Sequence, residues 1–231
     1  MENLIKELNN DFEVVDNFYG FVVIFGFKHK NLDNYIIPDG VNIIGDKCFE
    51  NSKLVNITIP NSVSIIGKNA FEKCNYLKEI IIPDSVKILE NESFIDCNKL
   101  EKVFLSNNLT KLGNGAFANC NNINEIKLPG QLQLIGINSF TENNKINKIV
   151  IDEGIKALGS SRFVNISCNI DDIYLPSSIK KICDKFIIFN GDFKINNIYY
   201  NGLEDEAKNI EILDEHFSFN KVIWHYKKGE Y

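Results

Sequence analysis

Apolar residues return along most of the chain at a period of 23 residues, in two short stretches per period. The first stretch has the form I-x-I, as in Ile80 and Ile82, and this alternation predicts a short β-strand with both isoleucines pointing inward. The second has the form V-x-x-I, as in Val86 and Leu89. A fixed interval between like residues predicts an elongated stack of similar coils, in which each coil packs only on its neighbours.

One phenylalanine marks each period. The interval from Phe49 to Phe71 is 22 residues, and each later interval is 23. The series is Phe49, Phe71, Phe94, Phe117, Phe140, Phe163 and Phe186. Because like residues occupy like places in successive coils, we expect these side chains to be stacked in a single row.

Proline and glycine also keep to fixed places in the period. All five prolines directly follow the first strand of a repeat, where a fixed φ and a missing N–H donor suit a corner. Glycine recurs one corner later, with Glu90 as an exception, and this predicts a tight corner that needs a positive φ or a close backbone approach. The glycines are Gly45, Gly67, Gly113, Gly136 and Gly159.

The start of the chain departs from the period. The pattern predicts a short helix with Leu4 and Leu8 on one face, a strand at residues 12–15, a turn at residues 16–17 and a second strand at residues 20–27. The first coil of a stack has an apolar face with no neighbour, so an atypical unit is expected there. We interpret this segment as a cap made of a helix and a β-hairpin.

The end of the chain departs again. Residues 203–213 are acidic and predict a helix, and residues 221–226 predict a last strand. The chain is therefore divided into an N-terminal cap at 1–35, an array of about seven repeats at 36–202 and a C-terminal cap at 203–231. We expect the three parts to form one continuous domain.

The repeat resembles a known family. Residues 54–74 carry the pattern L-x-x-I-x-I-P-x-x-V-x-x-I-G-x-x-A-F-x-x-C, which is similar to the BspA-like leucine-rich repeats, and the resemblance covers roughly residues 35–200. It implies a mainly β fold: a right-handed leucine-rich-repeat solenoid with short parallel strands, an N-terminal helix and hairpin cap, and a C-terminal α/β cap. It also implies protein binding, often by bacterial surface proteins and adhesins, and it implies no catalytic residues.

The six cysteines follow the period rather than a disulfide framework. Cys74, Cys97 and Cys120 each lie three residues after a repeat phenylalanine, and Asn143 takes this place one repeat later. Free cysteine behaves as a small buried apolar residue, so the pattern predicts packed thiols. A disulfide between stacked neighbours is the alternative, but it would leave one of these three unpaired.

Charge and hydropathy narrow the partners and the location. The net charge is -6 with scattered lysines, whereas a nucleic-acid binder would show a basic stripe, so that partner is disfavoured. No apolar run approaches the roughly 20 residues that span a bilayer, and no secretory signal is visible at the start. The sequence as given predicts a cytoplasmic protein. A cell-surface or secreted protein is the alternative if a signal has been trimmed.

The residues that carry enzymatic or metal chemistry do not gather in the sequence. His29, His216 and His225 all lie in the end segments, and none has a second histidine or cysteine at the spacing of a metal site. Gly113 and Gly115 lack the rest of a G-x-G-x-x-G phosphate loop. We therefore expect no metal, no cofactor, no catalytic residue and no enzymatic activity.

A column of outward residues is the candidate binding surface. The middle residue of each first strand points away from the core, toward the expected concave face, and most of these positions are apolar or aromatic. The column is Ile36, Thr58, Ile81, Phe104, Lys127, Val150, Tyr174 and Tyr199. An exposed apolar stripe often marks an interaction site, although β-branched and aromatic residues also pair well across strands. We expect it to bind a protein or peptide. A structural or self-associating scaffold, as a homodimer through the same face, is the alternative.

Charged residues flank this column. They alternate in sign from one repeat to the next, which predicts ion pairs between neighbouring strands and argues against a ligand of a single charge. The residues are Glu79, Lys102, Glu125, Lys148 and Asp172.

Overall fold

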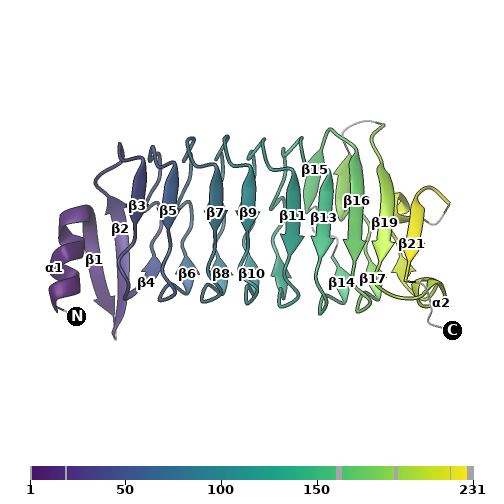
Figure 1. Ribbon diagram of the computed structural model, residues 1–231, viewed down its shortest axis with the longest axis horizontal. Coiled ribbons are helices and arrows are strands. Elements are labelled where there is room, and N and C mark those ends of the chain that lie inside the picture. Colours follow the sequence, from purple (N-terminus) through teal and green to yellow (C-terminus); the bar gives the residue numbers. More distant parts are fainter. Residues whose placement is uncertain (1, 19, 160–162, 190–191, 219, 228–231) are drawn as a thin grey trace.

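The computed structural model describes residues 2–18, 20–159, 163–189, 192–218 and 220–227. These residues form one elongated stack of β-coils, with the N-terminus at one end and the C-terminus at the other (Figure 1). The mainly β solenoid predicted from the repeat is confirmed.

The first strand of each coil contributes to one long side of the stack, which we call the front sheet (Figure 1). Neighbouring strands pair in parallel, in the groups β3-β5, β7-β9 and β11-β13-β16-β19-β21. The strands are β3 (Asn34–Ile36), β5 (Asn56–Thr58), β7 (Glu79–Ile81), β9 (Lys102–Phe104), β11 (Glu125–Leu128), β13 (Lys148–Ile151), β16 (Ile170–Leu175), β19 (Ile195–Tyr200) and β21 (Ile223–Tyr226).

The second apolar stretch of each coil forms another side, which we call the second sheet. Its hydrogen-bonded groups are β1-β2-β4-β6-β8-β10-β12 and β14-β17-β20. The strands are β1 (Phe12–Phe18), β2 (Phe21–Phe27), β4 (Val41–Ile44), β6 (Ile65–Ile66), β8 (Ile88–Leu89), β10 (Lys111–Leu112), β12 (Leu134–Ile135), β14 (Ala157–Leu158), β17 (Lys181–Ile182) and β20 (Glu211–Ile212). The third side consists mostly of turns, with one strand pair, β15 (Val164–Ile166) and β18 (Ile187–Phe189).

The N-terminal unit has the expected elements. Helix α1 (Glu2–Asp11) precedes an antiparallel hairpin of β1 and β2, and β2 pairs in parallel with β4, so the hairpin joins the second sheet. The turn expected at Asp16 and Asn17 is wrong, because Asp16 pairs with Val23 and Asn17 with Val22 within the ladder. The turn propensity of these two residues gives way to strand pairing with the apolar run of β2.

The C-terminal unit mixes helix and strand as expected, but its helix is shorter than predicted. Helix α2 covers only Glu204–Ala207, and the 3-10 helix η1 covers Glu215–Phe217. Ile212 lies instead in β20, where it pairs with Ile182 of the preceding coil. Strands β20 and β21 thus extend both sheets, and the boundaries assigned to the caps remain a prediction.

The phenylalanine row is confirmed. All seven rings are less than 2% exposed. Neighbouring ring centroids lie 4.8 to 5.2 Å apart, and the rings are nearly parallel except between Phe140 and Phe163, where the planes meet at 63°. The row runs through the hydrophobic core, and its spacing matches the distance of about 4.8 Å between adjacent β-strands.

The cysteines are free, as predicted. Cys48, Cys74, Cys97 and Cys120 are buried, and Cys168 and Cys183 are partly buried. The thiol of Cys97 donates to the carbonyl of Phe71 in the preceding coil at 3.1 Å, and Cys74 and Cys120 make the same contact in theirs.

Asn143 takes the place of the next cysteine. Its Nδ2 donates to the Phe117 carbonyl at 2.8 Å. This position therefore holds a small hydrogen-bond donor, either a thiol or an amide, which donates to a buried carbonyl oxygen of the preceding coil.

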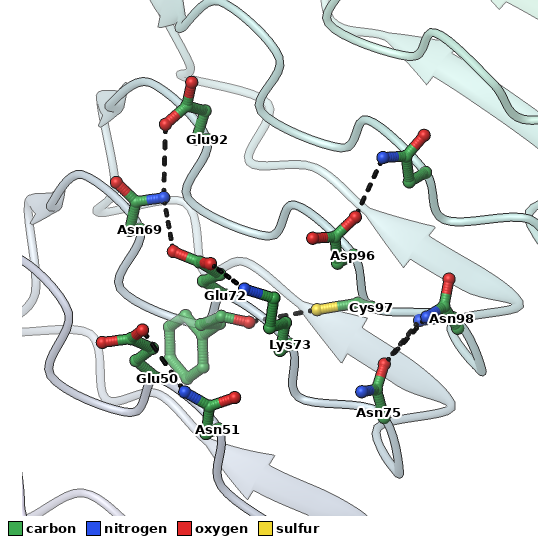
Figure 2. A network of polar contacts seen from close by, with 12 residues as sticks. Glu50, Asn51, Asn69, Glu72, Lys73, Asn75, Glu92, Asp96, Cys97 and Asn98 are labelled. Atoms are coloured by element: carbon green, nitrogen blue, oxygen red, sulfur yellow. Dashed lines mark hydrogen bonds and ion pairs between the residues drawn. The ribbon is translucent and has the colours of Figure 1, made fainter.

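Polar residues on the third side connect the coils in the same manner (Figure 2). Asn69 donates to Glu72 of its own coil at 2.8 Å and to Glu92 of the next coil at 3.3 Å. Asn98 donates to the Oδ1 of Asn75 at 3.1 Å. Side-chain amides at these turns therefore bridge successive coils, as is typical of asparagine in turns.

Four of the five recurring glycines, Gly45, Gly67, Gly113 and Gly136, serve close approach rather than positive φ. A Cβ on Gly113 would lie 2.5 Å from the Asn91 nitrogen, and one on Gly136 would lie 2.4 Å from the Asn114 nitrogen. Positive φ occurs instead at non-glycine residues on either side of the repeat phenylalanines, such as Asn69 at 55°. Glycine therefore recurs at this corner because the backbone of the neighbouring coil lies too close for a Cβ.

Candidate functional site

The middle residues of the front strands form one aligned column, which we call the front column. Ile36 pairs with Thr58, and Ile81 pairs with Phe104. In the five-stranded group the register runs through Lys127, Val150, Tyr174 and Tyr199. The eight candidate residues therefore occupy the middle positions of eight successive front strands, in register within each of the three groups, and the groups themselves lie side by side.

The two halves of the front column differ in exposure. Ile36 is 71% exposed, Ile81 59% and Phe104 51%, so these side chains stand free of the sheet. Val150, Tyr174 and Tyr199 are half-buried. The first half therefore exposes three apolar side chains together with Thr58, whereas Val150, Tyr174 and Tyr199 of the second half are partly covered.

An aromatic stack ends the column. The rings of Tyr174 and Tyr199 lie 4.7 Å apart and nearly parallel, and the ring of His225 continues the stack at 4.5 Å from Tyr199. The Nζ of Lys148, on the neighbouring strand β13, lies 5.5 Å from the centre of the Tyr174 ring and makes a cation–π contact with it.

His225 belongs to the column but was not among the candidates. It pairs with Tyr199 because β21 adds a ninth strand to the front sheet. The sequence does contain a pattern that could have identified His225: it lies between Trp224 and Tyr226, which match the two inward residues of the other first strands.

Four of the five flanking charges pair between strands, as predicted. Lys102 lies 3.8 Å from Glu79, and Lys148 lies 3.2 Å from Glu125. All four side chains are exposed by more than a third, so each pair contributes only about 0–1 kcal/mol to stability. These pairs balance the charge beside the column rather than creating a patch of one sign.

Shallow hollows lie along the column. One of about 370 Å³ and one of about 210 Å³ both include Phe104 and Lys127 in their walls. A third, of about 290 Å³, lies at the aromatic end, and we call it the C-terminal hollow. It is lined by Ile151, Asp152, Glu153, Tyr174, Leu175, Pro176, Tyr199, Tyr200 and Asn201.

Glu153 occupies the corner beside the C-terminal hollow and connects three coils. Its carboxylate accepts from the amide and hydroxyl of Ser177 at 2.8 and 3.0 Å, the amide of Ser178 at 3.1 Å and the Nδ2 of Asn201 at 2.7 Å. Partial burial acts to raise the pKa of Glu153, but these hydrogen bonds outweigh it and lower the pKa to about 2. Glu153 is therefore ionised throughout the physiological pH range.

Two of the three histidines pair with a single carboxylate, and the Nε2 of His225 lies 3.2 Å from the Oδ1 of Asn197. His29 lies 3.0 Å from Asp11, and His216 lies 2.8 Å from Asp214. Within the described parts of the chain, no group of three or more histidine, cysteine, aspartate or glutamate side chains could hold a metal ion. In the same residues, no helix is long and apolar enough to cross a membrane.

Comparison with protein families identifies the repeat. The model of the BspA-type leucine-rich repeat region matches residues 24–143 and 65–195, with six copies. The chain belongs to the BspA-type leucine-rich repeat family. Members share a repeat scaffold used generally for protein interaction and at cell surfaces, and this scaffold is typically non-enzymatic.

Solved structures agree with this BspA-type fold. A leucine-rich repeat protein from T. pallidum is 22% identical, with a TM-score of 0.62, over 78% of this chain and 83% of that one. The pneumococcal vaccine antigen PcpA is 17% identical, with a TM-score of 0.58, over 89% of this chain and 44% of that one. A Bacteroides ovatus protein is 20% identical, with a TM-score of 0.53, over 92% of this chain and 70% of that one. At these identities the likeness concerns the fold alone. Among curated protein sequences, none matches.

Proposed function

We propose that this chain is a non-enzymatic protein-interaction module, which binds a protein or peptide on the front sheet with Phe104, Tyr174 and Tyr199 at the centre. The observation that carries the proposal is the front column itself. Its outward positions hold apolar or aromatic residues at most coils, where a soluble protein usually has polar ones.

The column also has the anatomy of a protein interface. Large aromatic side chains supply most of the binding energy at such interfaces when they enter pockets, and charged side chains surround them. Phe104 stands beside two hollows, and the ion pairs Lys102–Glu79 and Lys148–Glu125 flank the column. This arrangement supports contact with an amphipathic surface rather than with a small polar molecule.

The distance between Phe104 and Tyr174 suggests what kind of peptide could bind both. Phe104 and Tyr174 are three front strands apart, which is roughly 14 Å at about 4.8 Å per strand. An extended peptide advances about 3.3 Å per residue, so side chains about four residues apart would reach both anchors. A peptide lying along the stack could therefore engage Phe104 and Tyr174 at once.

A pull-down tests the surface. The bait carries Phe104→Ser, Tyr174→Ser and Tyr199→Ser together, and it is offered cytoplasmic extract and, separately, extracellular matrix proteins. We expect the variant to lose partners that the unsubstituted chain retains. Circular dichroism verifies that the variant is folded, and equal recovery of partners by both baits would refute the choice of surface.

The structure offers a matched control with the same loss of apolar side chains elsewhere. Phe21, Leu134 and Ile137 lie outside the front sheet and are 54%, 53% and 50% exposed, close to the exposure of Phe104. A triple serine variant at these positions should keep the partners. If it loses them as fully as the front variant does, general surface hydrophobicity explains the binding.

Self-association through the same face is the second candidate. Ile36, Ile81 and Phe104 are each more than half exposed and could be covered by a second copy. Light scattering decides between the two, because a homodimer doubles the mass of the unsubstituted chain and the front triple variant restores the monomer. A strict monomer at high concentration removes this candidate.

A further inference from the structure

The C-terminal hollow is small. At about 290 Å³ it falls just below the range of about 300–1,000 Å³ that is usual for drug-sized ligands. Apolar walls come from Ile151, Leu175 and Pro176, and polar groups stand at the corner formed by Asp152 and Glu153. An amphipathic side chain with a long apolar stem fits this division.

Negative charge predominates around the hollow. Asp152 and Glu153 line it directly. Burial raises the pKa of Tyr200, and the charges of Glu206 and Glu153 raise it further. Burial likewise raises the pKa of Tyr199, with a contribution from the charge of Asp172. The tyrosines therefore sit in a field that favours a cation.

The lysines near the hollow are already engaged with other partners. Lys127 pairs with Asp152 at 3.0 Å, and Lys148 pairs with Glu125 at 3.2 Å. The hydrogen bonds described above for Glu153 come from neutral serine and asparagine donors, which leave its formal charge in place. A further positive group in the hollow would thus gain attraction without displacing a protein cation from Glu153.

Hydrogen-bonding polarity also favours a donor ligand. The Nδ2 of Asn201 is turned to Glu153, which leaves the Asn201 Oδ1 as the acceptor of that amide. The carboxylate of Asp152 is about one-third exposed and bonded to Lys127 through Oδ2. These side chains offer oxygen acceptors to a ligand, and a group that carries only donors satisfies them.

The faces of Tyr174 and Tyr199 are already occupied, which disfavours a ligand stacked on either of these rings. Tyr199 has Tyr174 against one face and His225 against the other, and Tyr174 has Tyr199 and Lys148. A sugar or planar base would need a free face for stacking. A flexible stem can instead lie along the ring edges and reach the carboxylates beyond them.

We propose that the C-terminal hollow receives an arginine side chain of the protein that binds the front sheet. Arginine combines a three-carbon apolar stem with a planar guanidinium of five donors, and its fork matches a carboxylate such as Asp152. Lysine presents a compact, strongly hydrated charge, which gains less from this set of spread acceptors. The inference rests on the proposed function, since it names the chemistry of one contact within it.

Short peptides test the hollow directly. The probe is acetyl-Gly-Arg-Gly-amide, and the matched probe carries citrulline, which keeps the shape of arginine but not its charge. Binding is followed by chemical-shift changes of the tyrosine rings. We expect the arginine peptide to bind at least about 10-fold more tightly than the citrulline peptide, a ratio equal to about 1.4 kcal/mol. Equal binding of the two, or tighter binding of a lysine peptide, overturns the proposal.

Two substitutions give opposite expected results. Asp152→Asn should weaken the arginine peptide several-fold. Lys127→Gln should strengthen it, because it removes the cation that competes for Asp152. Asp39→Asn makes the same charge change at the corner near the other end of the array and should leave the affinity unchanged. If Asp152→Asn has no effect, or if Asp39→Asn weakens binding equally, the site is not the C-terminal hollow.

The failure of this proposal is separable from that of the proposed function. Phe104→Ser should reduce capture of the protein partner and leave the arginine peptide unaffected, since Phe104 is not part of this hollow. Binding of the peptide without a partner that depends on Phe104 would support the hollow and contradict the interface. A partner that depends on Phe104, with no preference of the hollow for arginine over citrulline, would do the reverse.

Discussion

The phenylalanine row offers the sharpest test of the packing. Phe94 is fully buried, and its ring lies 4.8 Å from that of Phe71 and 5.0 Å from that of Phe117, parallel to both within 5°. Phe94→Ala removes the ring and leaves both neighbours facing a void. Truncation of a buried phenylalanine costs about 3–5 kcal/mol. Two stacked aromatic pairs, each worth about 0.5–1.5 kcal/mol beyond their buried area, place the expected loss in the upper part of that range.

The structure supplies a control with the same chemical change. Phe104→Ala also removes a ring, but this ring is 51% exposed on the front sheet. Surface substitutions usually change stability by about 0.5 kcal/mol or less, so we expect a small effect. The comparison therefore separates burial in the row from loss of aromatic area as such.

Urea unfolding measures both variants. Circular dichroism follows the whole sheet, and the fluorescence of Trp224, the only tryptophan, follows the C-terminal end. Because a stack of coils is held together by contacts between neighbours, a void at Phe94 could unfold one part before the other and separate the two signals. A loss below about 1 kcal/mol for Phe94→Ala, or equal losses for the two variants, would refute the role given to the row.

Three further predictions concern the thiols, the Glu153 corner and a close corner contact. In the native protein, the partly buried Cys168 and Cys183 should react with a thiol reagent at pH 8, Cys168 slowly because burial raises its pKa, whereas the four buried thiols, which the reagent cannot reach, should react only on unfolding. Because the pKa of Glu153 is lowered to about 2, its stabilisation is full above its ordinary pKa and declines as the pH falls toward 2. The loss of unfolding free energy caused by Glu153→Gln should therefore be about 1 kcal/mol near neutral pH, since the side chain is exposed, and should decline as the pH falls toward 2; a loss that does not change with pH would contradict it. Gly130→Ala should lower stability by about 1–3 kcal/mol, because its Cβ would meet the Glu153 carbonyl oxygen at 1.7 Å; thermal unfolding that leaves the midpoint unchanged would exclude this contact.

Much of the core could be predicted from the sequence because it repeats. Phe71 and Phe94 are one period apart, so in a stack they must be neighbours whatever the curvature of the array. The free thiols followed from the same reasoning, as did the ion pair between Glu79 and Lys102. Each of these contacts joins equivalent positions, and the period alone identifies its partners.

Local propensity misled the prediction where the period was absent. Asp16 and Asn17 carry a turn signal, yet they pair with Val23 and Val22 in the hairpin. The glycine pattern left two physical readings open, and only the positions of neighbouring backbones, such as those of Gly113 and Asn91, show that close approach is the reason. These features depend on atoms that lie on a neighbouring strand or coil.

The candidate surface, too, could be predicted from the sequence only in part. Its eight front-column positions follow from the alternation within each strand, but the ninth, His225, lies in a terminal unit that does not keep the period. The C-terminal hollow combines residues that are 50 positions apart, from Ile151 to Asn201.

The sequence by itself determined that the coils stack and which side chains lie above which, because a constant interval fixes each residue's neighbour in the next coil. Only the tertiary structure decided how the ends close and where a hollow opens. The terminal strands break the interval, and a hollow depends on the rotamers of unlike residues, such as Glu153 and Asn201, that no repeat relates.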